Sequence, residues 1–143
     1  MSAKSLKVIR RFDASPERVF DAFLDPAIAG QFMFATETGQ LVRVDIDPRV
    51  GGAYTFIVRR DGDDVEHVGK FLELVRPDRL VFEFAVPKYD PAVSVVRLEL
   101  AVDGDGCRLT LTHEGVDEDY REQTGKGWTM ILGSLARTLG DDA

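Results

Sequence analysis

The stretch VSVVRLELAVDGDGCRLTLTH, residues 93–113, decides the fold. Apolar and polar residues alternate over 93–102, which is typical of a β-strand with one buried face. Leu98 lies on the predicted buried face and Arg97 on the opposite face. The segment 103–106, Asp-Gly-Asp-Gly, places glycine at a bend, and the alternation resumes over 107–113. The stretch therefore predicts two neighbouring antiparallel strands.

Five further strands and two short helices are predicted before this pair. The strands fall at residues 6–12, 41–47, 53–60, 65–75 and 80–86. Ser15 and Asp25 each stand directly before a proline, and this order of N-cap and first-turn proline predicts helices that begin at Pro16 and Pro26. The second helix is expected to end near Phe32 because the chain leaves the helical spacing there.

The C-terminal segment changes its period to three and four residues, which predicts an amphipathic helix of several turns. Gly125, Gly127 and Gly133 each cost about 1 kcal/mol relative to alanine in a helix interior. They indicate either a fraying start or a close approach to the sheet. Because no helix separates the last six strands, we expect an α+β protein in which one face of an antiparallel sheet is covered.

Length and composition predict one acidic globular domain over residues 1–143. The chain has 143 residues, a net charge of −7 and 44% hydrophobic residues, enough to form a core without metal or disulfide. The lone Cys107 forms no intrachain disulfide, and neither a signal sequence nor an apolar run long enough to span a membrane is found. We therefore expect a cytoplasmic protein. The acidic balance disfavours nucleic acid as a partner.

Motifs for cofactors and metals are not recognised in the sequence. The chain has two histidines, His67 and His113, whose spacing from Cys107 is not that of a zinc site. We expect no metal and no cofactor. His113 and Glu114 are an alternative acid/base pair, but adjacent strand residues point to opposite faces. We therefore favour a structural role for them and predict no catalytic residue.

The order of the motifs resembles the SRPBCC superfamily (START-like, Bet v 1-like), and within it the activator of Hsp90 ATPase homologue 1-like group (AHSA1-like). The resemblance covers almost the entire chain. It is carried by residues 14–22, 25–26, 47–54, 69–74, 77, 79–82, 108–115 and by Gly127-Trp128 at the opening of the last helix.

The resemblance implies a helix-grip fold, in which a curved seven-stranded antiparallel sheet wraps around the C-terminal helix and two short helices close one end. It also implies a cavity between helix and sheet, where relatives bind lipids, sterols, hormones or polyketides. By alternation and helical spacing, the expected lining is Phe32, Phe34, Tyr54, Phe56, Phe71, Phe82, Phe84, Leu98, Trp128, Ile131 and Leu135. The polar side chains that we expect to anchor a ligand are Arg43, His67, Arg97 and His113.

Three functions remain open at this point. The first is a non-enzymatic protein whose cavity binds a small hydrophobic or amphipathic molecule, and an interior without a cavity above ~300 Å³ argues against it. The second is a chaperone cofactor or stress-related interaction module with an Hsp90-type partner. The third is a small cyclase, isomerase or hydrolase that uses the same cavity. Either a monomer or a homodimer is compatible with the sequence.

Overall fold

Seven antiparallel strands form one sheet in the computed structural model of the chain, which describes residues 5–33, 40–60, 62–87, 90–115 and 121–140. The strands are β1 (Ser5–Phe12), β2 (Gln40–Ile46), β3 (Ala53–Arg60), β4 (Asp63–Val75), β5 (Arg79–Val86), β6 (Asp90–Asp103) and β7 (Gly106–Glu114). Their order across the sheet is β1-β7-β6-β5-β4-β3-β2. The predicted pair over 93–113 is confirmed as β6 and β7, with Leu98 opposite Leu111.

Three helices accompany the sheet, namely α1 (Pro16–Ala22), α2 (Pro26–Phe32) and α3 (Arg121–Thr138). Both predicted N-caps are confirmed. The Ser15 hydroxyl accepts a hydrogen bond from the Arg18 amide at 3.2 Å, and the Asp25 carboxylate accepts one from the Ala27 amide at 3.0 Å. These bonds satisfy backbone donors that the first helical turn leaves without partners.

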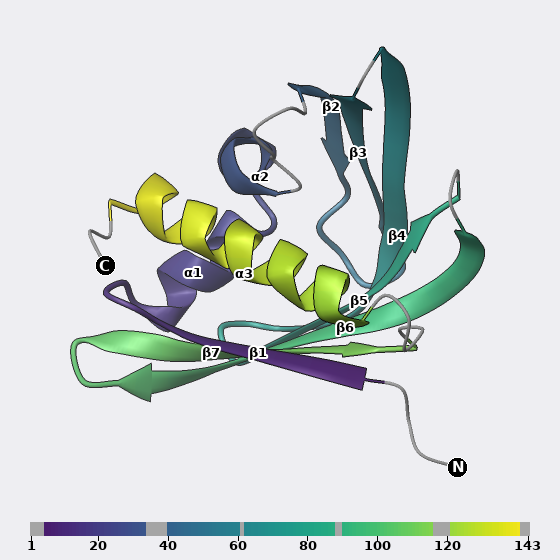
Figure 1. Ribbon diagram of the computed structural model, residues 1–143. Coiled ribbons are helices and arrows are strands. Elements are labelled where there is room, and N and C mark those ends of the chain that lie inside the picture. The colour runs from purple at the N-terminus through teal and green to yellow at the C-terminus, as the bar shows by residue number, and fades with distance from the viewer. Residues whose placement is uncertain (1–4, 34–39, 61, 88–89, 116–120, 141–143) are drawn as a thin grey trace.

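The helices lie on the concave side of the curved sheet (Figure 1). In that view β2, β3 and β4 stand at an angle to the strands from β5 to β1, and α3 crosses the space between the two halves. Irregular registers at residues 41–43, 71–73 and 84–86 mark the places where the ladder is interrupted, and such bulges bend strands and increase their twist. The α+β helix-grip fold is therefore confirmed.

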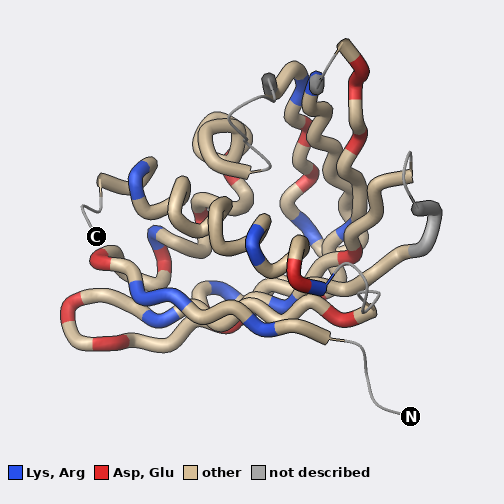
Figure 2. The backbone as a smooth tube through the Cα atoms, in the orientation of Figure 1, with Lys and Arg blue, Asp and Glu red and all other residues tan. Residues whose placement is uncertain are grey.

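The buried side chains form one cluster between the sheet and the helices. The inward faces of the strands, the apolar sides of α1 and α2 and the buried residues of α3 from Trp128 onward all contribute to it. Charged residues of both signs are interspersed along the outer strands and turns (Figure 2). None of the described helices is long and apolar enough to cross a membrane.

The glycines of α3 do not mark a close approach to the sheet. A Cβ atom built on Gly125 or Gly127 meets nothing within 4 Å, and one on Gly133 meets only the far end of the Arg137 side chain at 3.8 Å. The first expectation, a weak start of the helix, agrees better with this geometry, because Trp128 is the first buried residue of α3. The first two turns of α3 thus combine glycine with little burial.

Candidate functional site

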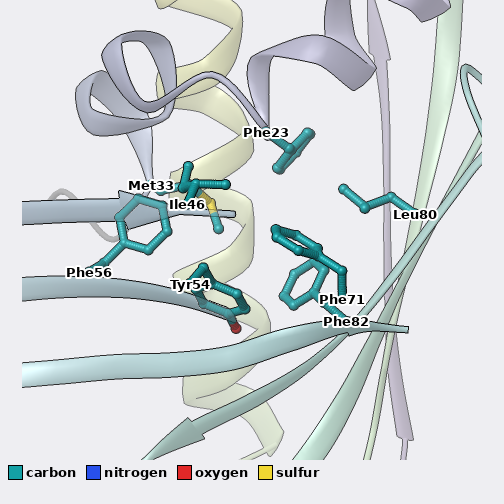
Figure 3. A pocket seen from close by; sticks show the side chains of 8 residues that line it. All are labelled: Phe23, Met33, Ile46, Tyr54, Phe56, Phe71, Leu80 and Phe82. Carbon is teal, nitrogen blue, oxygen red and sulfur yellow. The ribbon is translucent and has the colours of Figure 1, made fainter. Parts of the chain in front are cut away.

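Eight side chains surround a small apolar space inside the sheet, which we call the aromatic cavity (Figure 3). Its volume is about 10 Å³, close to the minimum that a single water molecule requires. Tyr54, Phe56, Phe71 and Phe82 of the expected lining are among them. The other four, which the sequence analysis did not include, are Phe23, Met33, Ile46 and Leu80.

Tyr54 is the centre of the aromatic cavity. Its ring contacts those of Phe71 and Phe82, each with a centroid distance of 5.6 Å. The Tyr54 hydroxyl donates a hydrogen bond to the Glu83 carbonyl oxygen at 2.8 Å, so it points out of the cavity into the backbone of β5. Burial raises the pKa of the Tyr54 phenol well above its usual value, and the hydroxyl therefore remains protonated and donating.

Gly69 in β4 leaves the space through which the Tyr54 side chain of β3 reaches the Glu83 carbonyl oxygen of β5. A Cβ atom on Gly69 stands 1.7 Å from the Glu83 carbonyl oxygen and 2.7 Å from the Tyr54 ring, distances that no side chain tolerates. The strand therefore needs a residue without a side chain at this point. The aromatic cavity owes its shape to that glycine as well as to its lining.

A second group of side chains lies beside the aromatic cavity on the concave face. We call it the histidine cluster, and it consists of His67, Phe84, Ser94, His113 and Trp128. The Phe84 ring lies between the two histidines, with centroid distances of 6.1 Å to His67 and 5.6 Å to His113. Both histidines are buried, whereas Phe84 and Ser94 are partly exposed. The histidine cluster therefore reaches from the core to the solvent boundary.

Hydrogen bonds run through the histidine cluster in one direction. The Trp128 indole N–H donates to Nδ1 of His113 at 3.0 Å. Nε2 of His113 lies 2.6 Å from the Ser94 hydroxyl, and that hydroxyl donates to the Phe84 carbonyl oxygen at 3.2 Å. An indole nitrogen can only donate and a carbonyl can only accept. The indole at one end of this series of hydrogen bonds and the carbonyl at the other consequently both place the His113 proton on Nε2, with Nδ1 as the acceptor.

This direction of the hydrogen bonds means that Ser94 and His113 are not arranged as a nucleophile and its general base. A general base needs a free lone pair towards the hydroxyl that it deprotonates, but the nitrogen facing Ser94 carries the proton. Burial also lowers the pKa of His113 from 6.5 to about 4. His113 is accordingly neutral at physiological pH and serves as a hydrogen-bonding group.

His113 and Glu114 point to opposite faces of β7, as their adjacency predicts. His113 is buried under α3, whereas the Glu114 carboxylate accepts a hydrogen bond from Arg97 at 3.1 Å outside the concave face. The two groups therefore do not enter one cavity. Among the described residues, no group of three His, Cys, Asp or Glu is placed to hold a metal ion.

Two of the four expected polar anchors lie in the wrong place for a ligand inside the fold. Arg97 lies between the inward-facing Val96 and Leu98, so alternation turns its side chain outward to Glu114. Arg43 is exposed and forms an ion pair with Asp45 on the same strand. Both side chains therefore leave the concave face in this structure, and the expectation that either arginine anchors a ligand there stays a prediction.

Of the expected lining residues outside the aromatic cavity and the histidine cluster, those that the structure describes are buried. Phe32 belongs to the core and packs edge to face on Phe23 with a centroid distance of 5.2 Å. The residues Leu98, Ile131 and Leu135 are buried between the sheet and α3. Phe34 lies outside the described residues.

Ser94 is the member of the histidine cluster that the sequence analysis did not include. Its position in β6 shares the inward parity of Val96 and Leu98, so a polar residue at an inward-facing position was the available signal. The partner of Ser94 was not predictable, because its bond to His113 depends on the diagonal packing of β6 and β7. Local alternation identifies the face on which a residue lies, whereas contacts across strands require the register.

A curved antiparallel sheet closed over one long C-terminal helix and two short helices is the architecture of START-like, helix-grip proteins. The chain belongs to one family of that class, described as Activator of Hsp90 ATPase homolog 1-like protein, which it matches over residues 13–140. None of the curated proteins matches the chain in sequence. The resemblance inferred from the motifs is thereby confirmed.

Solved structures from several bacteria are similar to the chain over nearly its full length. Protein CV1439 from Chromobacterium violaceum has 29% identity and a TM-score of 0.87, with 96% of this chain and 98% of that chain covered. Mll3558 from Rhizobium loti has 28% identity and a TM-score of 0.74, with coverage of 96% and 97%. CalU16 from Micromonospora echinospora has 26% identity and a TM-score of 0.70, with coverage of 95% and 76%.

Proposed function

We propose that the protein binds a small, apolar or amphipathic molecule between α3 and the concave face of the sheet. The observation that carries this proposal is the histidine cluster, a chain of polar groups at the partly exposed end of an otherwise apolar interior. Apolar surroundings with a few placed polar groups are typical of small-molecule sites. Such a chain has to be hydrogen-bonded at every member, whereas apolar side chains at the same positions carry no such requirement.

The binding site forms by displacement of side chains. Small-molecule pockets usually have volumes of roughly 300–1,000 Å³, and the aromatic cavity holds about 10 Å³. The criterion set out from the sequence therefore counts against a preformed cavity. The start of α3 is the part best suited to move, since its first buried residue is Trp128 and a Cβ atom added to Gly125 or Gly127 would meet nothing within 4 Å.

Native mass spectrometry of the purified protein tests the proposal directly. We expect a reproducible excess over the denatured mass and a single small apolar compound in the organic extract. A clean mass for the ligand-free chain, together with no thermal shift by neutral apolar probes such as naphthalene, would contradict the proposal. The protein should be purified without detergent, because detergent tails compete for the same apolar surface.

A matched pair of variants in α3 localises the binding. Ile131→Ala removes a buried side chain between α3 and the sheet, whereas Met130→Ala removes one that is half exposed on the other side of the helix. The space left by Ile131 should strengthen probe binding, as engineered apolar cavities bind small apolar molecules. Met130→Ala should leave it unchanged. Equal effects of the two substitutions would place the probe elsewhere.

A protein partner of the Hsp90 type is the second candidate, suggested by the family and by a groove on the outer side of the sheet. The groove has a volume of about 550 Å³ and carries charges of both signs at Arg79 and Glu99. A chaperone cofactor is expected to bind an Hsp90-type ATPase and to change its ATP hydrolysis. Arg79→Glu should weaken that binding, and titration without a change in hydrolysis would remove this candidate.

A further inference from the structure

The Trp128 indole occupies a slot that has the features of a ligand site. One wall is the Phe84 ring, at a centroid distance of 6.2 Å and an interplanar angle of 61°. The other is the His113 ring, at 6.0 Å and 73°. Edge-to-face distances of this size are favourable for aromatic rings. The walls of the slot therefore suit a planar aromatic group, which in this structure is the indole of α3.

The polar group of the slot is an acceptor. As long as the Ser94 hydroxyl donates to the Phe84 carbonyl oxygen, it can only accept from His113, and this keeps the His113 proton on Nε2. Nδ1 then keeps its lone pair towards the slot. A buried acceptor without a donor is costly, and any molecule that replaces the indole is favoured if it brings an O–H or N–H.

In the part of the chain that the structure describes, no charged side chain is buried where it could pair with a charged ligand in the slot. Among the described residues, the buried polar side chains are His67 and His113, and no Lys, Arg, Asp or Glu is buried. Arg10, which is partly buried, stacks over Phe12 at 5.6 Å. It lies four residues along β1 from Leu6, the residue that pairs with His113. A charged group in the slot would be desolvated without compensation.

We propose that the slot held by Trp128 is the recognition subsite of the protein, and that it takes an uncharged aromatic molecule carrying one hydroxyl or N–H donor. The ligand displaces the indole, donates to Nδ1 of His113 and lies against Phe84. The start of α3, with its glycines and low burial, moves outward to admit it. This inference rests on the proposed function. It adds the chemical class of the ligand and names His113 as the residue that recognises it.

Three matched probes test the inference by calorimetry at pH 7.5. They are 2-naphthol, which is neutral and has a donor, naphthalene, which is neutral without one, and 2-naphthoate, which is anionic. We expect 2-naphthol to bind about ten-fold more tightly than naphthalene, since one hydrogen bond replaces another only in its case. Binding of 2-naphthoate should be undetectable in the same concentration range.

Two variants assign the preference to named groups. In His113→Phe the affinities for 2-naphthol and naphthalene should become equal, because the acceptor is gone. In Trp128→Phe both probes should bind about ten-fold more tightly, because no indole hydrogen bond has to be broken, and the ratio between them should persist. Trp128→Phe keeps an aromatic side chain in the core, so it tests the inference even where His113→Phe fails to fold.

The single tryptophan of the chain supplies a direct readout of displacement. Its indole N–H gives one resonance in a ¹H–¹⁵N spectrum, which should move on addition of 2-naphthol and exchange faster with water. Equal affinities for 2-naphthol and naphthalene with an unmoved indole resonance overturn this inference and leave the proposed function standing. Absence of binding by both neutral probes, in wild type and in Trp128→Phe, overturns the proposed function as well.

Discussion

Lowering the pH from 7.5 to 5 should destabilise the protein through His113. In the unfolded chain His113 titrates near 6.5, whereas burial lowers its pKa in the folded protein to about 4. Between these values the unfolded chain binds the proton and the folded protein does not, so unfolding is favoured as the pH falls through that window. The stability is fully present above about pH 6.5 and declines towards pH 4.

The size of the effect follows from the separation of the two pKa values. Each pKa unit corresponds to 1.36 kcal/mol, which gives a total of about 3 kcal/mol below pH 4 and about 2 kcal/mol at pH 5. Burial is the cause of the lowered pKa of His113, and the geometry agrees with a neutral ring, because the Trp128 N–H points at Nδ1. A second proton on the ring would lie on Nδ1 and would point towards the Trp128 N–H, so two hydrogen-bond donors would face each other.

Urea unfolding at several pH values measures this contribution, with His113→Gln as the matched variant. The glutamine amide offers an acceptor to Trp128 and a donor to Ser94 but does not titrate in this range. Wild type should lose about 2 kcal/mol more than the variant between pH 7.5 and 5. All carboxylates and His67 are present in both proteins and cancel in the difference. Parallel stability curves would refute the lowered pKa of His113 and its buried neutral state.

Three stability predictions follow from the same geometry, each measured by chemical denaturation. Gly125→Ala and Gly127→Ala should each stabilise the protein by about 1 kcal/mol, since the added methyl groups meet nothing and helix propensity improves; a loss of stability would show that these glycines are needed for contacts. Gly69→Ala should destabilise by more than about 2 kcal/mol, because its methyl group collides with a β5 carbonyl oxygen; near-neutral stability would mean that the two strands separate at little cost. Arg76→Ala should cost less than about 1 kcal/mol despite two hydrogen bonds to Asp21, at 2.8 and 2.9 Å, because both side chains are half exposed; a larger loss would mean that this link holds α1 in place.

Most of the fold was predictable from local patterns. The period of two identified the strands, and the two pairs of N-cap and proline located the starts of α1 and α2. The face of each strand residue also followed from parity, which is why His113 and Glu114 were correctly assigned to opposite faces. These features depend on neighbours within a few residues, and such information is contained in the sequence itself.

The candidate site was predictable only in part, because its geometry depends on contacts between distant segments. Parity already placed Arg97 outside, yet its charge suggested an anchor, and the structure shows that parity decides. The bond from Trp128 to His113 joins residues 15 positions apart on a helix and a strand. No spacing rule predicts such a bond, since it depends on how α3 rotates as it crosses the sheet.

Two features that are locally unfavourable for stability lie close together in this fold. A polar chain through Ser94 and His113 occupies positions where apolar side chains would pack without hydrogen-bonding requirements. The helix that covers it begins with glycines that alanine would improve. Sequences that fold well are usually consistent at every level, and departures from that consistency gather at functional sites. The proposed exchange of the Trp128 indole for a ligand needs this combination, a polar group in the core beneath a helix that begins with glycines.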